Sequence, residues 1–551
     1  MTHPSPDRPE ELTALQASMI RPLQQEKRPP CAACASGTDV RGWIALIAQR
    51  RKLGLSDQEA FTRAWESVAA INPFPAVMGR ICPHPCQDEC SRAGKDGPVA
   101  INALERFLGD WGLDQGLPLP RLAEPGSRPE SIGVVGAGPA GLSFAFQMAR
   151  RGYRVTVYES ASKPGGALYY GIPQYRLPEE TLEREIGRIL DLGVELRLDT
   201  AVGRHVDLAT LRSRHEVLFL GVGAGRGLTL GIPGEDGPGS MTGTDYLARV
   251  NRGEPVELGE RVVVVGGGNT AIDAARAARR SGADVTMLYR RTRAEMPAIA
   301  AEVEDALAEG VTIEFLAAPV EVIRDEGRLV GVVVRRMALG EPDRSGRRAP
   351  VPIPGSDYPL AADSVIAAVS QQPDWSGLER PGETVWAEPA PHGELLEGVW
   401  TGGDTMGLGI AGRAIAQGRE AAETVDARLR GAPPPARPAV DPLPKGAVKP
   451  DFYPARPPVT LPRQPADYWH TDPDAELQDT ITEAEFLHEV GRCFSCGLCY
   501  GCEQCFMFCN AAGFARLTHG KPGAYFAVHL ERCQACGKCA DLCPCGFLTP
   551  N

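Results

Sequence analysis

At 551 residues, with 43% hydrophobic and 23% charged side chains, the chain is too long for one ordinary domain and predicts about three or four. Its formal net charge of −12 argues against nucleic-acid binding, which usually needs a basic patch. No apolar stretch is long enough to predict a membrane span, and the first residues lack a secretory signal pattern, so we expect a cytoplasmic protein.

The sixteen cysteines occur in two groups only. Five fall between Cys31 and Cys90, within a region of helical pattern, and eleven fall between Cys493 and Cys545. Disulfides are rare in cytoplasmic proteins, and ordinary core cysteines would not avoid the whole centre of the chain. The clustering therefore indicates metal ligation.

The segment "SIGVVGAGPAGLSFAFQMARRGYRVTVYE" predicts a buried strand, a glycine turn, a helix and a second strand. Such glycines let backbone N–H groups approach a pyrophosphate at the helix N-terminus, and the final acid can accept ribose hydroxyls. A merely tight strand–helix turn is the alternative, disfavoured by this context. The predicted dinucleotide-binding residues are Gly136, Gly138, Pro139, Ala140, Gly141 and Glu159.

The segment "ERVVVVGGGNTAIDAARAARRSGADVTMLYRR" repeats this plan, with alanine at the third glycine position. Its second strand ends in two arginines where an acid would bind a 2′-hydroxyl, and arginine suits a 2′-phosphate, so NADPH is favoured over NADH. The alternative is a solvated strand end. The predicted binding residues are Gly266, Gly268, Asn269, Thr270, Arg290 and Arg291.

The segment "GVWTGGDTMGLGIAGRAIAQGREAAETV" predicts another strand, loop and helix late in the chain, which suggests that the second α/β domain is inserted in the first. A proline-rich stretch follows, too rich in proline for helix or central strand, and predicts a stiff, extended linker across the surface of the core. After the linker, "TEAEFLHEVGRC" predicts a short helix.

The tail contains "CQACGKCADLCP", the C-x2-C-x2-C-x3-C-P run of bacterial ferredoxins, and an earlier run of the same spacing. The fourth cysteine of each run ligates the other cluster in two-cluster ferredoxins. A zinc site would instead need two separate CxxC pairs. Asn510 follows the first run where proline is usual, but proline is no ligand. The predicted clusters are Cys499, Cys502, Cys505 and Cys543, and Cys533, Cys536, Cys539 and Cys509.

The motifs "VVGAGPAGLS", "PGGALYYGIPQYRLP", "GGGNTAIDAAR" and "YRRTRAEMPA" resemble the small (β) subunit of NADPH-dependent glutamate synthase and its relatives, over roughly residues 30 to 425. The resemblance implies FAD in the first site and NAD(P)H in the second. It also implies that Gly165 and Gly166 approach the flavin and that Gly403 and Asp404 bind its ribityl–phosphate side, although Asp404 could be a turn residue. Hydride transfer between these cofactors needs no protein acid or base, so we nominate no catalytic side chain.

The stretch "INPFPAVMGRICPHPC" carries the same resemblance, which implies two 4Fe–4S clusters in the N-terminal domain. One ligand of the pair in dihydropyrimidine dehydrogenase, a member of this group, is a glutamine, and Glu105 falls at that position. The alternative for Glu105 is an ordinary exposed helix acid. The first cluster implied is Cys34, Cys82, Cys86 and Glu105.

The second N-terminal cluster is left with only Cys31 and Cys90. The family normally begins this domain with an "RCxxC" pair, but residues 1–30 contain no cysteine and the pair stands in "GRCFSCG" near the far end. We therefore hypothesise that Cys493 and Cys496 complete this cluster, in the same chain or in a dimer partner. Free thiols, or a ferredoxin register that begins at Cys493, are the alternatives; Cys545 has no assigned role.

These observations predict a multidomain protein in which a helical iron–sulfur domain precedes two Rossmann-like α/β domains, a linker and a ferredoxin-like α+β domain. The predicted function is electron transfer between NAD(P)H and a low-potential protein partner, ferredoxin or a larger enzyme, through FAD and four 4Fe–4S clusters. The alternative is a non-autonomous electron-input subunit of a complex of the glutamate synthase, 2-oxoacid:ferredoxin oxidoreductase or sulfite reductase type. The predicted domains are 1–125 (helical iron–sulfur), 126–250 and 376–430 (FAD), 251–375 (NAD(P)H), 431–480 (linker) and 481–551 (ferredoxin-like).

Overall fold

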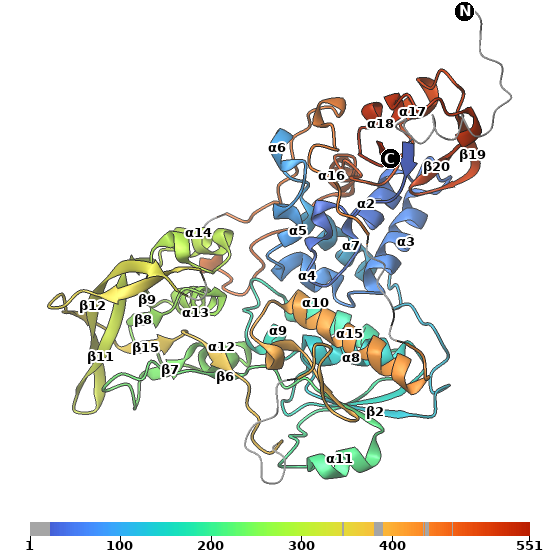
Figure 1. Cartoon of the computed structure of the whole chain (residues 1–551). Helices are drawn as coiled ribbons and strands as arrows, with labels where there is room; N and C mark the ends of the chain where they lie inside the picture. Colours follow the sequence, from blue (N-terminus) through green and yellow to red (C-terminus); the bar gives the residue numbers. More distant parts are fainter. Residues whose placement is uncertain are drawn as a thin grey trace, which may run out of the picture.

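The structure is a computed structural model that describes residues 22–343, 346–378, 389–433, 435, 440–465 and 467–550. The first 21 residues of the predicted N-terminal domain, and parts of the predicted linker, lie outside this range. Figure 1 shows a helical region at the centre, one α/β domain below it, a second α/β domain to its left and the cysteine-rich tail beside it at the upper right. None of the helices described is long and apolar enough to cross a membrane.

The central region is built from four longer helices and short turns around the N-terminal cysteines. Helices α4 and α7 cross closely because glycines stand at the contact: a Cβ on Gly79 would lie 2.3 Å from the Arg106 Cα, and one on Gly109 would lie 2.3 Å from the Ala76 N. This close approach brings the end of α4 against the side of α7. The elements are η1 (Pro30–Ala33), α2 (Val40–Ala48), α3 (Asp57–Ala69), α4 (Pro75–Ile81), α5 (Pro85–Asp88), α6 (Ala93–Asp96) and α7 (Ile101–Asp114).

The first α/β domain has a six-stranded sheet in the order β17-β18-β5-β2-β3-β4, parallel except for β17. Strand β18 pairs with β5 only after the second sheet is complete, so the chain leaves this domain and returns to it. Its strands are β2 (Ser131–Val135), β3 (Arg154–Tyr158), β4 (Glu195–Arg197), β5 (Val217–Leu220), β17 (Glu394–Leu396) and β18 (Val399–Thr401). Its helices are α8 (Pro139–Ala149), α9 (Ala167–Tyr170), α10 (Glu179–Leu190), α11 (Leu208–Arg214) and α15 (Ala411–Leu429), with η3 (Gly403–Met406).

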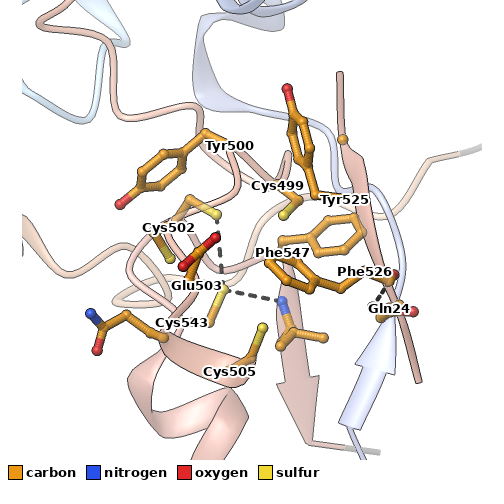
Figure 2. A pocket seen from close by; sticks show the side chains of 14 residues that line it. Gln24, Cys499, Tyr500, Cys502, Glu503, Cys505, Tyr525, Phe526, Cys543 and Phe547 are labelled. Atoms are coloured by element: carbon orange, nitrogen blue, oxygen red, sulfur yellow. Dashed lines mark hydrogen bonds between the residues drawn. The ribbon is translucent and has the colours of Figure 1, made fainter. Parts of the chain in front are cut away.

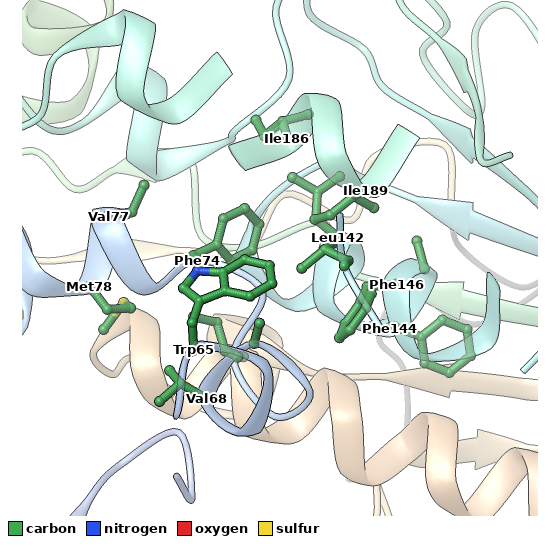
Figure 3. Packing of buried hydrophobic residues seen from close by; sticks show 14 of the residues in the cluster. Trp65, Val68, Phe74, Val77, Met78, Leu142, Phe144, Phe146, Ile186 and Ile189 are labelled. Carbon is green, nitrogen blue, oxygen red and sulfur yellow. The ribbon is translucent and has the colours of Figure 1, made fainter. Parts of the chain in front are cut away.

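One hydrophobic core joins the helical region to this domain. Figure 3 shows Trp65 and Phe74 of the helical region beside Leu142 of α8 and Ile189 of α10, and all four are fully buried. Burial of such large apolar side chains is the main favourable contribution to packing. The two domains therefore form one packed unit.

The second α/β domain has a parallel sheet in the order β10-β9-β8-β15-β7. Strand β7 and nearly all of helix α12 lie before residue 251, where the sequence analysis placed the start of this domain. An antiparallel meander, β11 to β14, follows β10 in the chain, and the sequence analysis did not predict it. The main elements are β7 (Ser240–Thr242), α12 (Gly243–Asn251), β8 (Arg261–Val265), α13 (Asn269–Arg280), β9 (Asp284–Tyr289), η2 (Arg293–Glu295), α14 (Ala300–Ala308), β10 (Thr312–Phe315) and β15 (Ser364–Ala367). The meander strands are β11 (Ala317–Asp325), β12 (Arg328–Pro342), β13 (Arg348–Pro352) and β14 (Tyr358–Ala361), and a ribbon pairs β6 (Arg226–Gly227) with β16 (Gln371–Gln372).

The described part of 431–480 has only two short 3₁₀ turns, η4 (Pro450–Phe452) and η5 (Tyr468–His470). It crosses the second α/β domain, where Arg280 donates to the Pro473 carbonyl, and the helical region, where Glu476 pairs with Arg80 at 2.9 Å and Arg106 at 2.8 Å. This segment therefore links two domains that are distant in sequence.

The tail returns to the beginning of the chain. Helix α16 packs on α7 and α2, and strand β21 pairs antiparallel with β1, the first described element. The elements are β1 (Pro22–Gln24), α16 (Glu483–Val490), α17 (Gln504–Met507), β19 (Phe514–Lys521), β20 (Ala524–Val528), η6 (Leu530–Arg532), α18 (Lys538–Leu542) and β21 (Leu548–Pro550).

Candidate cofactor and cluster sites

The first cysteine-lined pocket lies in the helical region, and we call it the N-terminal pocket. Cys34 ends η1, Cys82 ends α4, Cys86 lies in α5 and Glu105 faces the same space from α7. Glu105 is not an ordinary exposed helix acid: burial raises its pKa to about 7, and a hydrogen bond from Asn72 at 3.3 Å acts in the opposite direction. Burial also raises the pKa of Cys82 to about 12.

The second pocket, the shared pocket, is lined by cysteines from both ends of the chain. Cys31 and Cys90 come from the helical region, and Cys493 and Cys496 come from the tail of the same chain. Burial raises the pKa of Cys31 and raises that of Cys493 to about 12, and in each case a neighbouring cysteine adds to the shift.

Buried arginines hold the tail at the shared pocket. Arg492 is 0% exposed; it pairs with Glu489 and, at 3.1 Å, with Asp96. Arg92 donates to the Arg492 carbonyl, and Arg41 donates to the Cys496 carbonyl at 2.9 Å. The cysteine motif alone did not reveal this network, although the arginine directly before Cys493 was a visible signal.

The third pocket, the tail pocket, lies wholly in the last sixty residues except for one side chain of β1. Figure 2 shows Cys499, Cys502, Cys505 and Cys543 around it, beside the ring of Phe547. Burial raises the pKa of Cys499 to about 11 and that of Cys505 to about 12. Cys545, which the sequence left unassigned, lines the same pocket.

The remaining predicted ligands, also in the tail, are Cys509, Cys533, Cys536 and Cys539. Burial raises the pKa of Cys539 to about 11, and the neighbouring Cys533 and Cys536 add to this increase. A Cβ on Gly513 would lie 3.4 Å from the Cys509 Sγ and 3.9 Å from the Cys533 Cα, so these two cysteines flank the same glycine. Among the sixteen cysteines, all within the described residues, Cys536 is the exposed one.

The donor sets fit iron–sulfur clusters on chemical grounds. Several buried thiols around one cavity cannot all ionise without a cation, because each thiolate disfavours the next, and a bound metal reverses this penalty. Within the described residues, no three His, Cys, Asp or Glu side chains meet closely enough to hold a single metal ion. The cysteines of the N-terminal, shared and tail pockets line cavities instead, which suits a multi-atom cluster.

The first glycine turn lies at the N-terminus of α8 and contacts the second predicted flavin loop. Gly165 N donates to the Ala137 carbonyl at 2.8 Å, and a Cβ on Gly166, where φ is +55°, would lie 2.8 Å from the Gly138 Cα. Glu159, at the end of β3, accepts from the Ala137 N at 2.7 Å and so holds the turn in place. The two loops therefore lie side by side, as a shared flavin site needs. The turn's other predicted residues are Gly136 before α8 and Pro139, Ala140 and Gly141 in its first turn.

The late loop approaches the same helix end. A Cβ on Gly403 would lie 3.1 Å from the Ala140 Cβ, and Gly403 N donates to the Gln417 side chain at 2.8 Å. Asp404 accepts from Gly409 N at 3.1 Å, and burial raises its pKa. Asp404 thus has a turn-stabilising bond as well as a position beside the flavin loops.

The second glycine turn lies at the N-terminus of α13. Gly266, at φ +149°, leaves no room for a side chain, since a Cβ would lie 2.3 Å from the Ala368 carbonyl oxygen. Gly268 is the N-cap residue, and the Asn269 side chain accepts from Ile299 N at 2.9 Å. Thr270 follows in the first turn of the helix.

The two arginines after β9 differ in environment. Arg290 is exposed. Arg291 is only 4% exposed, donates to the Arg348 carbonyl at 2.7 Å and pairs with Asp343. The Arg291 side chain therefore packs against the meander, whereas Arg290 is exposed to solvent. The two arginines, predicted to bind the nucleotide together, lie in different environments.

Comparison with known proteins identifies related sequences. Residues 130–418 match the pyridine nucleotide-disulphide oxidoreductase family, and residues 10–117 match dihydropyrimidine dehydrogenase domain II, a 4Fe–4S cluster domain. The chain is 33% identical over 416 residues to the small chain of glutamate synthase [NADPH] from Halomonas elongata, covering 71% of this chain and 86% of that one.

Longer relatives are also similar. The chain is 40% identical over 398 residues to the β subunit of the NADP(+)-dependent formate dehydrogenase of Moorella thermoacetica, covering 66% of this chain and 56% of that one. It is 31% identical over 541 residues to the putative oxidoreductase YgfK of Escherichia coli O157:H7, covering 94% of this chain and 48% of that one. The chain thus spans about half the length of these longer curated relatives. Among solved structures, FprA of Mycobacterium tuberculosis in complex with NADPH has a TM-score of 0.47 and 21% identity, covering 55% of this chain and 85% of that one.

Proposed function

Since the chain belongs to the pyridine nucleotide-disulphide oxidoreductase family and, within it, groups with glutamate synthase small chains, we propose that it exchanges electrons between NADPH and a one-electron protein partner. Its cofactors are FAD, NAD(P)H and 4Fe–4S clusters. FAD, when bound, links two-electron hydride chemistry to one-electron transfer. The protein's own residues bind these groups, orient them and exclude water.

The observation that carries this proposal is the shared pocket. Cys31 and Cys90 meet Cys493 and Cys496 there, so one site joins the helical region to the tail. A cluster held by these four residues would require the tail to dock on the domain next to the flavin.

The pockets follow one another in a series from the flavin loops to the tail. Gly412 of α15, the helix that follows the late flavin loop, lines the N-terminal pocket. Ile101 lines both the N-terminal and the shared pocket. Gly497, which follows Cys496, donates to the Cys545 carbonyl in the tail pocket at 2.6 Å. This order supports electron transfer from the flavin through the helical region into the tail.

We propose that this chain supplies the ligands of four clusters. The tail pair would make residues 481–551 a ferredoxin-like domain, and the exposed Cys536 marks the outermost cluster as the point of exchange with a partner. The ligand sets are Cys34, Cys82, Cys86 and Glu105; Cys31, Cys90, Cys493 and Cys496; Cys499, Cys502, Cys505 and Cys543; and Cys509, Cys533, Cys536 and Cys539.

The proposed nucleotide preference rests on Arg290. A guanidinium at the end of β9 suits a 2′-phosphate by charge and geometry, and Arg290 is exposed there. Arg291 would act indirectly, by fixing the strand end against the meander.

A second candidate is an electron-input subunit that turns over only within a larger complex. The formate dehydrogenase relative is named as a β subunit, and this supports the candidate. The partner would be ferredoxin or a larger enzyme. We also propose that the protein is located in the cytoplasm and can form a homodimer.

The test is an anaerobic titration of the purified protein with NADPH and with NADH, followed at flavin and cluster wavelengths, with iron measured. Bleaching of both chromophores with about sixteen iron atoms per chain, four per cluster, supports the proposal. Flavin bleaching with clusters that stay oxidised, even after long incubation, would contradict transfer through the series. Cluster reduction that appears only when a partner complex is added would favour the second candidate.

A further inference from the structure

Cys545 is the one cysteine of the chain that the proposed ligand sets do not use. It is 2% exposed and lies two residues after Cys543, which is 7% exposed. The two Sγ atoms are 3.8 Å apart, within hydrogen-bond range for sulfur, and both residues line the tail pocket with Cys499, Cys502 and Cys505. Five thiols thus surround a site that needs four.

The direction of the sulfur–sulfur hydrogen bond follows from ligation. A cysteine that binds iron does so as a thiolate, which carries no proton and can only accept. If Cys543 is the ligand, Cys545 must be the donor. The Leu548 N also donates to the Cys543 Sγ, at 3.4 Å, so this sulfur receives two hydrogen bonds.

The main chain holds Cys545 in this position. Gly497 N donates to the Cys545 carbonyl at 2.6 Å, and Gly497 directly follows Cys496 of the shared pocket. A Cβ on Gly497, at φ +69°, would lie 2.8 Å from the Lys27 Cβ, so the loop fits closely against the segment between β1 and η1. Cys545 is therefore fixed by the same contact that joins the two pockets.

We propose that Cys545 is a positioning residue that donates an S–H···S hydrogen bond to the ligand Cys543 and thereby raises the reduction potential of the tail-pocket cluster. The inference rests on the proposed function. Hydrogen bonds to ligand sulfurs stabilise the more electron-rich, reduced cluster, and they are among the features that set cluster potentials. A raised potential favours electron flow from the shared pocket toward the tail.

The test compares four forms of the full-length protein: wild type, Cys545→Ala, Cys545→Ser and Phe526→Leu. Alanine removes the donor and serine keeps one. The leucine change removes part of a buried ring from the same pocket wall, at a residue that donates no hydrogen bond to Cys543. Each form is analysed for iron and titrated with redox mediators under anaerobic conditions, with the clusters followed by electron paramagnetic resonance. The component altered in Cys502→Ala identifies the tail-pocket cluster.

We expect unchanged iron in all four forms. Cys545→Ala should shift the reduction equilibrium of that component by up to about tenfold toward the oxidised state, about 59 mV for a one-electron couple. Cys545→Ser should restore most of the wild-type value, and Phe526→Leu should not move it.

Identical potentials in all four forms would overturn the inference. Loss of about four iron atoms in Cys545→Ala would overturn it too, since Cys545 would then be the ligand itself. Failure of the proposed function would give a different result. If the tail pocket held no cluster, the wild-type protein itself would lack the paramagnetic resonance signal that Cys502→Ala is expected to alter.

Discussion

Phe107 and Phe486 stack in the core of the helical region, with ring centroids 4.1 Å apart and an interplanar angle of 23°. Phe107 lies on α7 and Phe486 on α16, which follows the linker near the other end of the chain. The rings of Phe61 and Phe486 form a T-shaped contact, with centroids 5.2 Å apart. The tail helix is thus part of the N-terminal core, and it carries the loop with Cys493 and Cys496 into the shared pocket.

Phe486→Ala should therefore destabilise the helical region as well as the tail. Phe486 is 0% exposed, and loss of a buried phenylalanine side chain costs about 3–5 kcal/mol of unfolding free energy. We expect a lower denaturation midpoint together with a loss of iron. Phe506→Ala, at a 36% exposed site in the same tail, is the matched control and should change neither quantity by much. A midpoint equal to that of wild type would show that α16 does not pack as described.

Cys493→Ala and Cys496→Ala should each remove the cluster of the shared pocket. The expected loss is about four iron atoms per chain, while flavin content and flavin reduction by NADPH stay normal. Electron delivery to an added acceptor should fall sharply, since the series of sites is broken. Iron that stays at the wild-type level in both variants would instead favour the free-thiol interpretation of this pair.

Local patterns of sequence predicted the family and the cofactors, and the comparisons confirm both. Glycine turns and cysteine runs carry their information within a few residues, so spacing alone is enough to recognise them. The proposal that the RCxxC pair completes an N-terminal cluster needed a different argument, a count of missing ligands, because no local pattern reports contacts between the two ends of a chain. Its ligand assignment stays a prediction.

Other features depended on long-range packing that the sequence does not display. Arg290 and Arg291 look equivalent in "MLYRR", yet the Arg348 carbonyl on β13 and Asp343 bind only the second. The meander that provides both was not predicted, because its strands follow the β/α repeat without a distinct motif. The sequence analysis assigned no role to Cys545, because the distance between its sulfur and that of Cys543 depends on the backbone conformation of residues 543–545.

The two arginines should respond differently to substitution. Arg290→Ala should raise the KM for NADPH by at least about tenfold, as expected for losing a charge-assisted hydrogen bond of ~1.5–3 kcal/mol, with little effect on NADH. Arg291→Ala should instead lower stability, since it leaves the Arg348 carbonyl and Asp343 without this partner. Steady-state kinetics with both nucleotides, beside thermal unfolding of both variants, separate the two roles. If both variants lost their preference for NADPH over NADH equally, the result would instead support the prediction from sequence that both arginines bind the 2′-phosphate.

His215 should make stability depend on pH. The side chain forms hydrogen bonds with Ser131 Oγ at 2.7 Å and Tyr158 Oη at 3.0 Å, and burial lowers its pKa from 6.5. The unfolded chain then binds the proton more tightly, so stability is complete above about pH 6.5 and is lost as the pH falls toward the folded-state pKa. His215→Gln should flatten this part of the profile. His392→Gln, at an exposed site, is the control, and a wild-type profile flat between pH 5 and pH 7 would contradict the expectation.

Gly166→Ala should reduce flavin binding. A Cβ at this position would lie 2.8 Å from the Gly138 Cα, and φ of +55° strains any residue with a side chain, so the two flavin loops would have to separate. Gly187→Ala on α10 is the matched control: a Cβ there meets nothing within 4 Å, and alanine in a helix interior is favoured over glycine by about 1 kcal/mol. Flavin content of the purified variants is the measurement. We expect Gly166→Ala to lose FAD and Gly187→Ala to keep it with equal or higher stability; full FAD content in Gly166→Ala would mean that the contact between the loops does not shape the flavin site.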